Sequence, residues 1–136
     1  MPVIRHADTR RTETPNAVMT TLASPTQGGA RQAVWRVDMR PGQTGPLHGI
    51  DTEQVWTVLA GGATVDLDSQ ALTVGPGDTL VMPADAPRRV HADPAAGFTA
   101  IAVAPAGTRA YTLDETKVAA GCAVPDGSKL VPAWVV

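Results

Sequence analysis

Short runs of alternating apolar and polar residues follow one another through the middle of the chain. The clearest run covers residues 33–39, where every second position is apolar and the positions between them include Arg36 and Asp38. Successive side chains of a β-strand point to opposite faces, so this alternation predicts a strand with one buried face. The expected inward side chains are Ala33, Trp35, Val37 and Met39.

Further strands are predicted after this one, separated by clusters of Gly, Pro and Asp at intervals of about ten residues. Their ranges are 54–59, 63–68, 70–74, 79–82, 87–91 and 98–103. The pair Gly61-Gly62 is expected to join the first two of these strands in a hairpin. Many short strands with regularly spaced turns are typical of an all-β sandwich or barrel.

Less regular segments flank these strands. Residues 1–29 are rich in Thr and contain one predicted strand near 17–22, which we expect to form an extra edge strand. Residues 106–136 are expected to be an irregular tail with a short helix near 114–120. Its apolar end, LVPAWVV, is expected to dock, because it would otherwise leave an exposed apolar patch. We therefore predict one domain over 1–136, with a barrel core at about 30–105.

Composition and charge narrow the possible partners. The chain of 136 residues has a formal net charge of -2, so it lacks the basic field that binds nucleic acids or anionic membranes. It has no apolar run of about 20 residues and its first residues are polar, which predicts a soluble cytoplasmic protein. The only cysteine, Cys122, cannot form an intramolecular disulfide and is interpreted as a small residue of a turn.

Two groups of spaced residues carry the main functional signal. The first consists of Gly42, His48, Ile50, Gln54 and Gly61. The second consists of Gly77, Pro83, Asp85, Arg88 and Ala92. In spacing, these groups resemble the two sequence motifs of the cupin family, and the resemblance covers roughly residues 30–105. It implies a cupin double-stranded β-helix, a jelly-roll barrel, of the small RmlC-like kind.

The resemblance also implies a metal site whose ligands are largely replaced here. The family's positions are two histidines and a glutamate in the first motif and a histidine in the second, and only His48 remains a good ligand. Ile50 cannot bind a metal, Gln54 offers a weak neutral oxygen, and Arg88 would repel a cation. We therefore expect no metal or other cofactor.

A rearranged metal site remains an alternative at this point. Its ligands would come from His48, Asp51, Glu53 and His91. Strand alternation argues against His91, because an inward Arg88 places Val90 inside the barrel and His91 outside.

The same alternation predicts a pocket inside the barrel. It places Gln54, Trp56 and Val58 in the interior, together with Trp35 and Arg88. Aromatic side chains with a few polar groups are typical of a small-molecule pocket, although simple core filling by the two tryptophans is the alternative. The predicted substrate-binding residues are Trp35, Met39, Ile50, Trp56 and Val58.

Three residues are candidates for catalysis. His48 titrates near neutral pH and is the expected general acid or base, oriented by Asp51 or Glu53. Arg88 and Gln54 are expected to hold or polarise a substrate oxygen. The alternatives are a histidine that only forms hydrogen bonds, and an Arg88 that is exposed or pairs with a nearby acidic residue. Those acidic residues are Asp51, Glu53 and Asp85.

The combined features favour a cupin that acts on a small molecule. The first hypothesis is a metal-independent acid-base enzyme of isomerase, epimerase, cyclase or lyase type, although the only tyrosine, Tyr111, gives no clear tyrosine partner in the barrel. The second is a non-catalytic binding or sensing protein. The third is a metal-dependent dioxygenase or isomerase with atypical ligands. Pairing through sheet edges and the terminal extensions is expected to give a homodimer.

Overall fold

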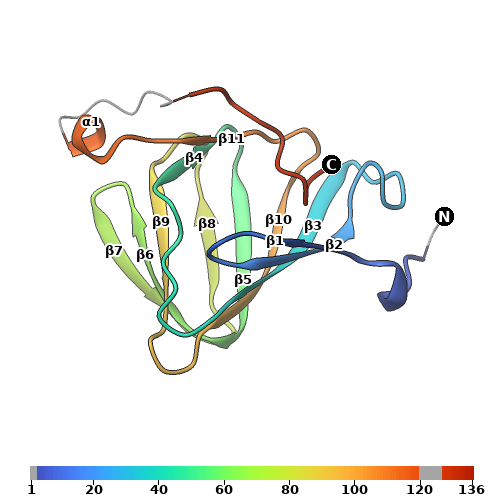
Figure 1. Ribbon diagram of the computed structural model, residues 1–136, viewed down its shortest axis with the longest axis horizontal. Coiled ribbons are helices and arrows are strands. Elements are labelled where there is room, and N and C mark those ends of the chain that lie inside the picture. Colours follow the sequence, from blue (N-terminus) through green and yellow to red (C-terminus); the bar gives the residue numbers. More distant parts are fainter. Residues whose placement is uncertain (1–2, 120–126) are drawn as a thin grey trace.

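The computed structural model describes residues 3–119 and 127–136 and consists mainly of two antiparallel β-sheets that face each other (Figure 1). The larger sheet has the order β1 (Arg10–Glu13), β2 (Val18–Ala23), β3 (Gln32–Met39), β10 (Phe98–Pro105), β5 (Gln54–Gly61) and β8 (Thr79–Met82). The smaller sheet has the order β11 (Ala110–Thr112), β4 (His48–Ile50), β9 (Arg88–Ala92), β6 (Ala63–Leu67) and β7 (Gln70–Val74). The expected all-β jelly roll is confirmed.

The core lies between the two sheets and follows the predicted alternation. In β3, the four side chains expected to point inward are buried. The central strand β10 alternates in the same way, and three of its four inward residues are alanines. Small side chains on this strand leave room in the barrel for larger ones from its neighbours β3 and β5. The inward residues of β10 are Phe98, Ala100, Ala102 and Ala104.

The predicted hairpin between residues 54–59 and 63–68 is wrong. Strand β5 pairs with β10 and β8, whereas β6 pairs with β7 and β9 in the opposite sheet. Gly61 and Gly62 form a corner between the sheets, where the Gly62 N–H donates to the carbonyl of Gly97 at 2.9 Å. Gly61 has a positive φ of 68°, and a Cβ there would overlap the backbone of Gly97. The two glycines therefore permit a change of sheet instead of a two-residue turn.

The N-terminal extension contributes two strands instead of the single one predicted. After a short 3-10 helix at His6–Asp8, β1 and β2 form a hairpin that pairs with β3 and extends the larger sheet. The hairpin turn is held by the Thr14 hydroxyl, which accepts hydrogen bonds from the N–H groups of Asn16 and Ala17 at 3.2 and 3.0 Å. This turn lies over the interior of the barrel (Figure 1).

The C-terminal tail contains the predicted short helix, here α1 (Glu115–Ala119), and its apolar end docks only in part, because Val131 and Val136 remain exposed. Val135 is 1% exposed and belongs to the core, whereas Leu130 remains 67% exposed. The carbonyl of Val136 accepts hydrogen bonds from Arg10 and Ser24 at 2.6 Å each. The tail is thus anchored to the N-terminal strands.

Two further predictions concern Cys122 and the absence of a membrane-spanning segment. Cys122 lies outside the described residues. None of the helices in the described part of the chain has the length and apolar character needed to cross a membrane.

Candidate functional site

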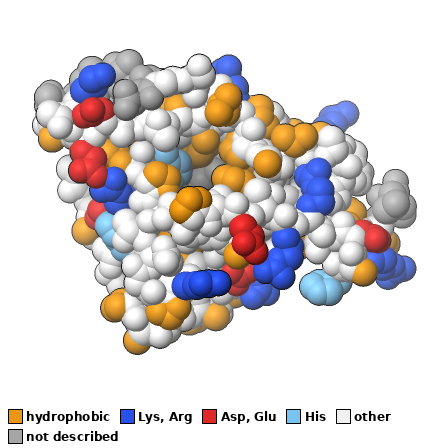
Figure 2. All heavy atoms as spheres, viewed as in Figure 1, with side chains coloured by type: hydrophobic (Ala, Val, Ile, Leu, Met, Phe, Trp, Pro, Cys, Tyr) orange, Lys and Arg blue, Asp and Glu red, His pale blue; other side chains and the backbone are white. Residues whose placement is uncertain are grey.

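A cavity of about 480 Å³ lies inside the barrel. One wall is the inward face of the larger sheet, the opposite wall comes from β4, β9 and β11, and the opening is narrowed by the β1–β2 turn and the C-terminal tail. Figure 2 shows a hollow on this side of the molecule, bordered by hydrophobic side chains. The lining is mostly apolar with a few polar side chains, which is the usual composition of a small-molecule site.

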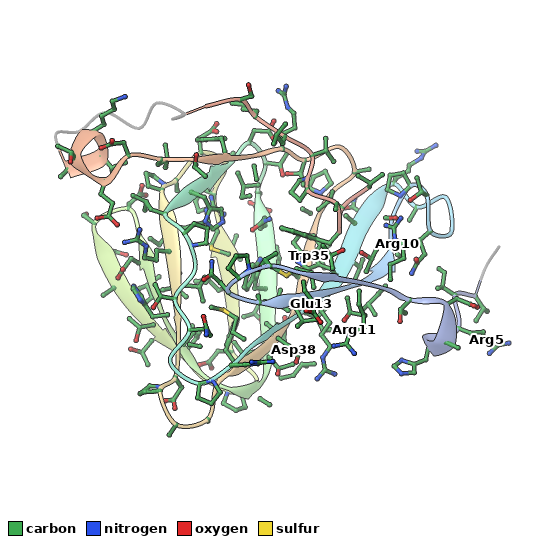
Figure 3. All side chains as sticks on the ribbon, viewed as in Figure 1. Arg5, Arg10, Arg11, Glu13, Trp35 and Asp38 are labelled. Atoms are coloured by element: carbon green, nitrogen blue, oxygen red, sulfur yellow. The ribbon has the colours of Figure 1, made fainter. Side chains whose placement is uncertain are left out.

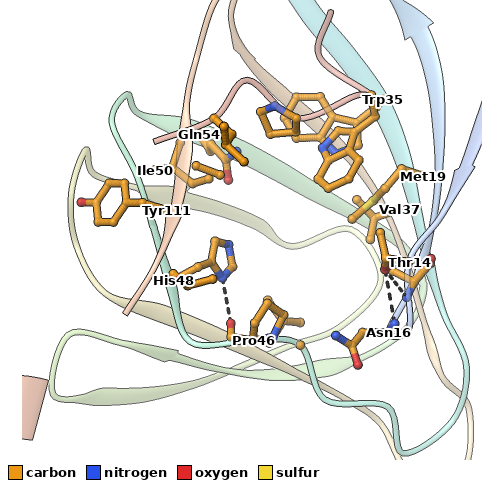
Figure 4. A pocket seen from close by; sticks show the side chains of 18 of the residues that line it. Thr14, Asn16, Met19, Trp35, Val37, Pro46, His48, Ile50, Gln54 and Tyr111 are labelled. Atoms are coloured by element: carbon orange, nitrogen blue, oxygen red, sulfur yellow. Dashed lines mark hydrogen bonds between the residues drawn. The ribbon is translucent and has the colours of Figure 1, made fainter. Parts of the chain in front are cut away.

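The structure brings together six of the eight residues predicted for the site. These six line the cavity, and most are labelled in Figure 4: Trp35, Met39, His48, Ile50, Gln54 and Trp56. The other two, Val58 and Arg88, are buried but are not among the described residues that line it. Strand alternation therefore identified the inward residues correctly, but an inward position is not always a position on the cavity.

His48 presents one ring nitrogen to the cavity. Its Nδ1 lies 2.8 Å from the carbonyl oxygen of Pro46, which only accepts, so Nδ1 carries the proton and Nε2 of the neutral ring has a lone pair. Figure 4 shows Nδ1 turned to Pro46 and the ring projecting into the cavity. The orienting group is thus a backbone carbonyl. Asp51, expected in that role, instead accepts a hydrogen bond from Arg109 at 2.9 Å.

The surroundings of His48 favour its neutral form. Burial lowers the pKa of His48 below its ordinary value, the hydrogen bond to Pro46 partly opposes this effect, and the positive charges of Arg88 and Arg89 add to the lowering. An imidazole with a lowered pKa is unprotonated at neutral pH. His48 is therefore able to accept a proton from a molecule in the cavity.

Gln54 and Trp56 form a polar pair on the opposite wall. They are two positions apart on β5, so both side chains point inward, and the Trp56 Nε1–H donates to Gln54 Oε1 at 3.2 Å. Trp56 also stacks on Phe98, with ring centroids 6.1 Å apart. The hydrogen bond occupies the amide oxygen of Gln54, so its amide nitrogen is the part left to donate to a ligand.

Arg88 is fully buried, yet its guanidinium is held by backbone carbonyls. Its Nε donates to Ala86 at 3.0 Å and its Nη2 donates to Pro83 at 2.6 Å. Its Nη1 has no partner in the described part of the chain. Burial lowers the pKa of Arg88 to about 10, so it remains charged at neutral pH. Arg88 is directly opposite His48 in the β4–β9 pairing, and its contact with a substrate oxygen stays a prediction.

Sequence reasoning missed Tyr111 as a wall of the cavity. Strand β11 pairs with β4 and sets Tyr111 opposite Gly49, where the absence of a side chain makes room for the phenol ring. The Tyr111 hydroxyl donates to Asp85 at 2.6 Å and points away from the cavity (Figure 4). Burial, together with the hydrogen bond to Asp85, raises the pKa of Tyr111 to about 12. The ring therefore forms part of the cavity wall, while the hydroxyl is already hydrogen-bonded to Asp85.

The terminal extensions supply other lining residues that the motifs did not indicate. Thr14, Asn16 and Met19 come from the N-terminal hairpin, and Pro132 and Trp134 come from the tail. The only sequence signal for the tail was its apolar end, which predicted docking without a location. The hairpin gave no comparable signal, because its position over the cavity depends on the pairing of β2 with β3.

Together, the two sheets and the enclosed cavity define a small jelly-roll protein built around a ligand-sized apolar pocket. The chain belongs to the Cupin domain family, whose pattern matches residues 35–103.

Solved structures support the same fold. The polyketide cyclase RemF from Streptomyces resistomycificus is similar with a TM-score of 0.68 and 22% identity, covering 85% of this chain and 88% of that one. A cupin-2 domain protein from Rhodospirillum rubrum reaches a TM-score of 0.74 at 14% identity, covering 86% of this chain and 83% of that one. KdgF from Halomonas sp. has a TM-score of 0.63 and 17% identity, with 76% and 92% covered. The comparison with curated proteins finds no match.

The described residues do not match the donor set that the family's metal needs. They contain no group of three or more His, Cys, Asp or Glu side chains placed to hold a metal ion. His91, considered as a substitute ligand, contacts Asp66 with Nε2 at 2.7 Å and Thr44 with Nδ1 at 3.2 Å. The neighbouring Val90 is buried and lines the cavity, so the predicted orientation of these two side chains is confirmed.

Proposed function

We propose that this protein is a metal-independent acid-base enzyme that acts on an oxygenated organic molecule held in the barrel. The observation that carries the proposal is the unprotonated Nε2 of His48, which faces an apolar cavity and is fixed in its tautomer by the carbonyl of Pro46. Such a proton transfer is a possible first step for reactions of the isomerase, epimerase, cyclase or lyase type.

The proposed first step uses groups that this chain supplies. His48 Nε2 removes a proton from a carbon next to a carbonyl group of the substrate, and the electron pair of the C–H bond moves toward the carbonyl oxygen. Donors on the opposite wall, such as the amide nitrogen of Gln54, stabilise the negative charge on that oxygen. Return of the proton from His48 to another carbon completes an isomerisation, and departure of a neighbouring leaving group completes an elimination.

The comparisons support this class of function at a general level. Named neighbours include a polyketide cyclase and the DMSP lyase DddQ from Ruegeria pomeroyi, which is similar with a TM-score of 0.63 and 19% identity over 74% of this chain and 58% of that one. The proposal of metal independence rests on this chain's own residues, because Ile50, Gln54 and Arg88 occupy the family's ligand positions.

Proton exchange in deuterated buffer tests the proposal without knowledge of the natural substrate. The probe is 1-tetralone, a bicyclic ketone whose exchangeable α-protons are followed by proton NMR. The wild-type protein is expected to exchange these protons faster than buffer alone, and His48→Gln is expected to lose this acceleration. His91→Gln is the matched control, because His91 lies on the outer face and contacts Asp66.

The outcomes separate the enzyme from the second candidate, a non-catalytic binding protein. That candidate is favoured by one observation: the hydroxyl of Tyr111 is bound to Asp85, so His48 has no tyrosine partner in the cavity. If the wild type binds 1-tetralone but does not accelerate the exchange of its α-protons, the proposed catalysis is overturned. The protein would then be a non-catalytic binding protein. Equal exchange by wild type and His48→Gln would remove His48 from the mechanism.

Elemental analysis of protein purified without chelators or an affinity tag tests metal independence separately. We expect transition metals well below one equivalent. One equivalent of metal that is lost in His48→Ala would overturn this part of the proposal and favour metal-dependent chemistry with an atypical ligand set.

We also propose a homodimer formed through β1, the outer strand of the larger sheet. Figure 3 shows the charged side chains of this strand outside the barrel. An antiparallel pairing of two copies centred on Thr12 sets Arg11 of one copy opposite Glu13 of the other, and both residues are exposed. Light scattering is expected to give a dimer for the wild type and a monomer for R11E. A dimer restored in the double variant R11E/E13R would support this register, and a monomeric wild type would refute it.

A further inference from the structure

The indole N–H of Trp35 is a buried donor that lacks an acceptor. Trp35 is 1% exposed, and its Nε1 has no hydrogen-bond partner among residues 3–119 and 127–136. The side chain lines the cavity and projects into it from β3 (Figure 4). Buried donors in native proteins are nearly always paired, because an unpaired one keeps its full desolvation cost. A group that enters the cavity is therefore the natural partner of this N–H.

Trp56 provides a comparison within the same sheet. Trp35 and Trp56 lie on either side of Ala102 in the β3–β10–β5 pairing, so their side chains stand on the same inward face. The indole N–H of Trp56 is satisfied by Gln54 Oε1. The two tryptophans thus have the same orientation relative to the sheet, but only Trp35 keeps a donor for a ligand.

The polar groups around the cavity have a defined pattern. Trp35 and Gln54 contribute N–H donors from the larger sheet, and neutral His48 contributes an acceptor from the smaller sheet. The Thr14 hydroxyl already forms hydrogen bonds within the β1–β2 turn. Much of the remaining lining is apolar, including Val37, Met39 and Ile50. A complementary ligand has an apolar body and an oxygen that accepts a hydrogen bond.

We propose that Trp35 is the specificity-determining donor of this cavity and that its ligands are apolar carbonyl compounds whose oxygen accepts the Trp35 N–H. The inference specifies the substrate class of the site described under the proposed function and shares its location. It requires only binding, however, so it does not depend on proton transfer by His48.

A matched pair of ligands measures the contribution of the oxygen. The compounds are 1-tetralone and tetralin, which share a fused bicyclic skeleton and differ in the carbonyl oxygen. Binding of both is measured to wild-type protein and to protein in which Trp35 is replaced by 3-benzothienylalanine, which substitutes sulfur for the indole N–H with little change of shape. This design forms a double-mutant cycle between the ligand oxygen and the N–H.

The expected result is a preference for the ketone that depends on Trp35. The ratio of the tetralin Kd to the 1-tetralone Kd should fall by about fivefold or more in the Trp35 analogue, as expected for one buried hydrogen bond. The same replacement at Trp134, which also lines the cavity, is the control and should leave the ratio unchanged. An unchanged ratio in the Trp35 analogue, or an equal change at Trp134, would overturn the proposal.

A second measurement uses the wild-type protein and remains valid if the analogue does not fold. The chain has three tryptophans, so its indole N–H resonances are few and can be assigned with Trp56→Phe and Trp134→Phe. The Trp35 resonance should move downfield with 1-tetralone but not with tetralin. Equal movement with both compounds, or binding of neither, would contradict the proposal. Ketone-specific movement without proton exchange would instead contradict only the proposed catalysis.

Discussion

The guanidinium of Arg88 brings a fixed positive charge into the barrel beside His48. The two residues are directly opposite in the β4–β9 pairing, and Arg88 is 1% exposed. Its hydrogen bonds to Pro83 and Ala86 involve neutral carbonyls, so no carboxylate contacts it directly in the described structure. A buried charge of this kind acts over several ångströms because water does not screen it well. Arg88 therefore acts electrostatically on His48, although it is not among the described residues that line the cavity.

We expect Arg88→Met to raise the pKa of His48, because removal of the positive charge makes protonation of the ring easier. Arg88→Lys should preserve most of the effect. The measurement is an NMR titration of the His48 ring, assigned by its loss in His48→Gln. Arg36→Met is the control, because Arg36 is exposed and paired with Asp38 at 2.9 Å.

The other groups near His48 are the same in the wild type and in Arg88→Met. Arg89 on β9 also lowers the pKa of His48 and contacts Glu115, while Tyr111 on β11 remains bonded to Asp85. An unchanged titration of His48 in Arg88→Met would show that the charge of Arg88 does not contribute to its lowered pKa.

The lowered pKa of His48 also predicts how stability changes with pH. Below the unfolded-state pKa of about 6.5, the unfolded chain takes up a proton at this position before the native protein does. The free energy of unfolding therefore falls as the pH drops from 6.5 toward the native pKa of His48. Urea unfolding at several pH values should show a smaller loss for His48→Gln than for the wild type. A loss of the same size in both proteins would assign it to other groups.

At the scale of strands, sequence periodicity predicts which side chains point inward but not which strands pair. The inward positions of β3 and β5 and the orientations of Arg88 and His91 followed from alternation alone. The hairpin assigned to Gly61-Gly62 was wrong, because two glycines permit a sheet-to-sheet corner as readily as a turn. Pairing is determined by long-range contacts, on which local alternation carries no information.

The candidate site likewise contains residues that the sequence predicts and residues that it does not. The motif residues His48, Ile50 and Gln54 lie on β4 and β5, so their convergence was predictable from the cupin spacing. Tyr111 joins them only because β11 pairs with β4, and Trp134 only because the tail folds back. Neither contact leaves a periodic pattern in the sequence. The unpaired N–H of Trp35 likewise depends on where acceptors lie in three dimensions.

The pairing of β4 with β11 predicts a strong effect of Gly49→Ala. A Cβ at Gly49 would overlap the phenol ring of Tyr111 and force β11 away from the cavity wall. We expect a loss of about 1–3 kcal/mol in the free energy of unfolding, as for other overpacked sites. Gly45→Ala is the matched control, because its Cβ would meet only the Val90 carbonyl at 3.7 Å. Guanidinium unfolding of both variants tests this, and equal stabilities would contradict it.

At the scale of the whole molecule, the two ends of the described chain close the cavity together. The N-terminal hairpin and the C-terminal tail both line it, and they contact each other through the Val136 carbonyl, which accepts from Arg10, Ser24 and Thr26. The Thr21 hydroxyl on β2 also donates to the carbonyl of Trp134 at 2.8 Å. Closure of the pocket thus depends on segments outside the residues that match the Cupin domain family.

Val135 is the apolar anchor of this closure, so Val135→Asp should release the tail. Its side chain is 1% exposed in the core, and an unpaired carboxylate cannot remain there without a large desolvation cost. We expect a loss of about 2–4 kcal/mol in the free energy of unfolding and faster dissociation of bound 1-tetralone, because the cavity loses part of its cover.

Hydrogen exchange should show loss of protection at the Leu130 amide, which donates to the Ala110 carbonyl at 2.9 Å. Val131→Asp is the control, because Val131 is 42% exposed and a carboxylate there stays in water. If Val135→Asp weakened the barrel but left the Leu130 amide protected, the tail would be held by its hydrogen bonds to the N-terminal strands and not by burial of Val135.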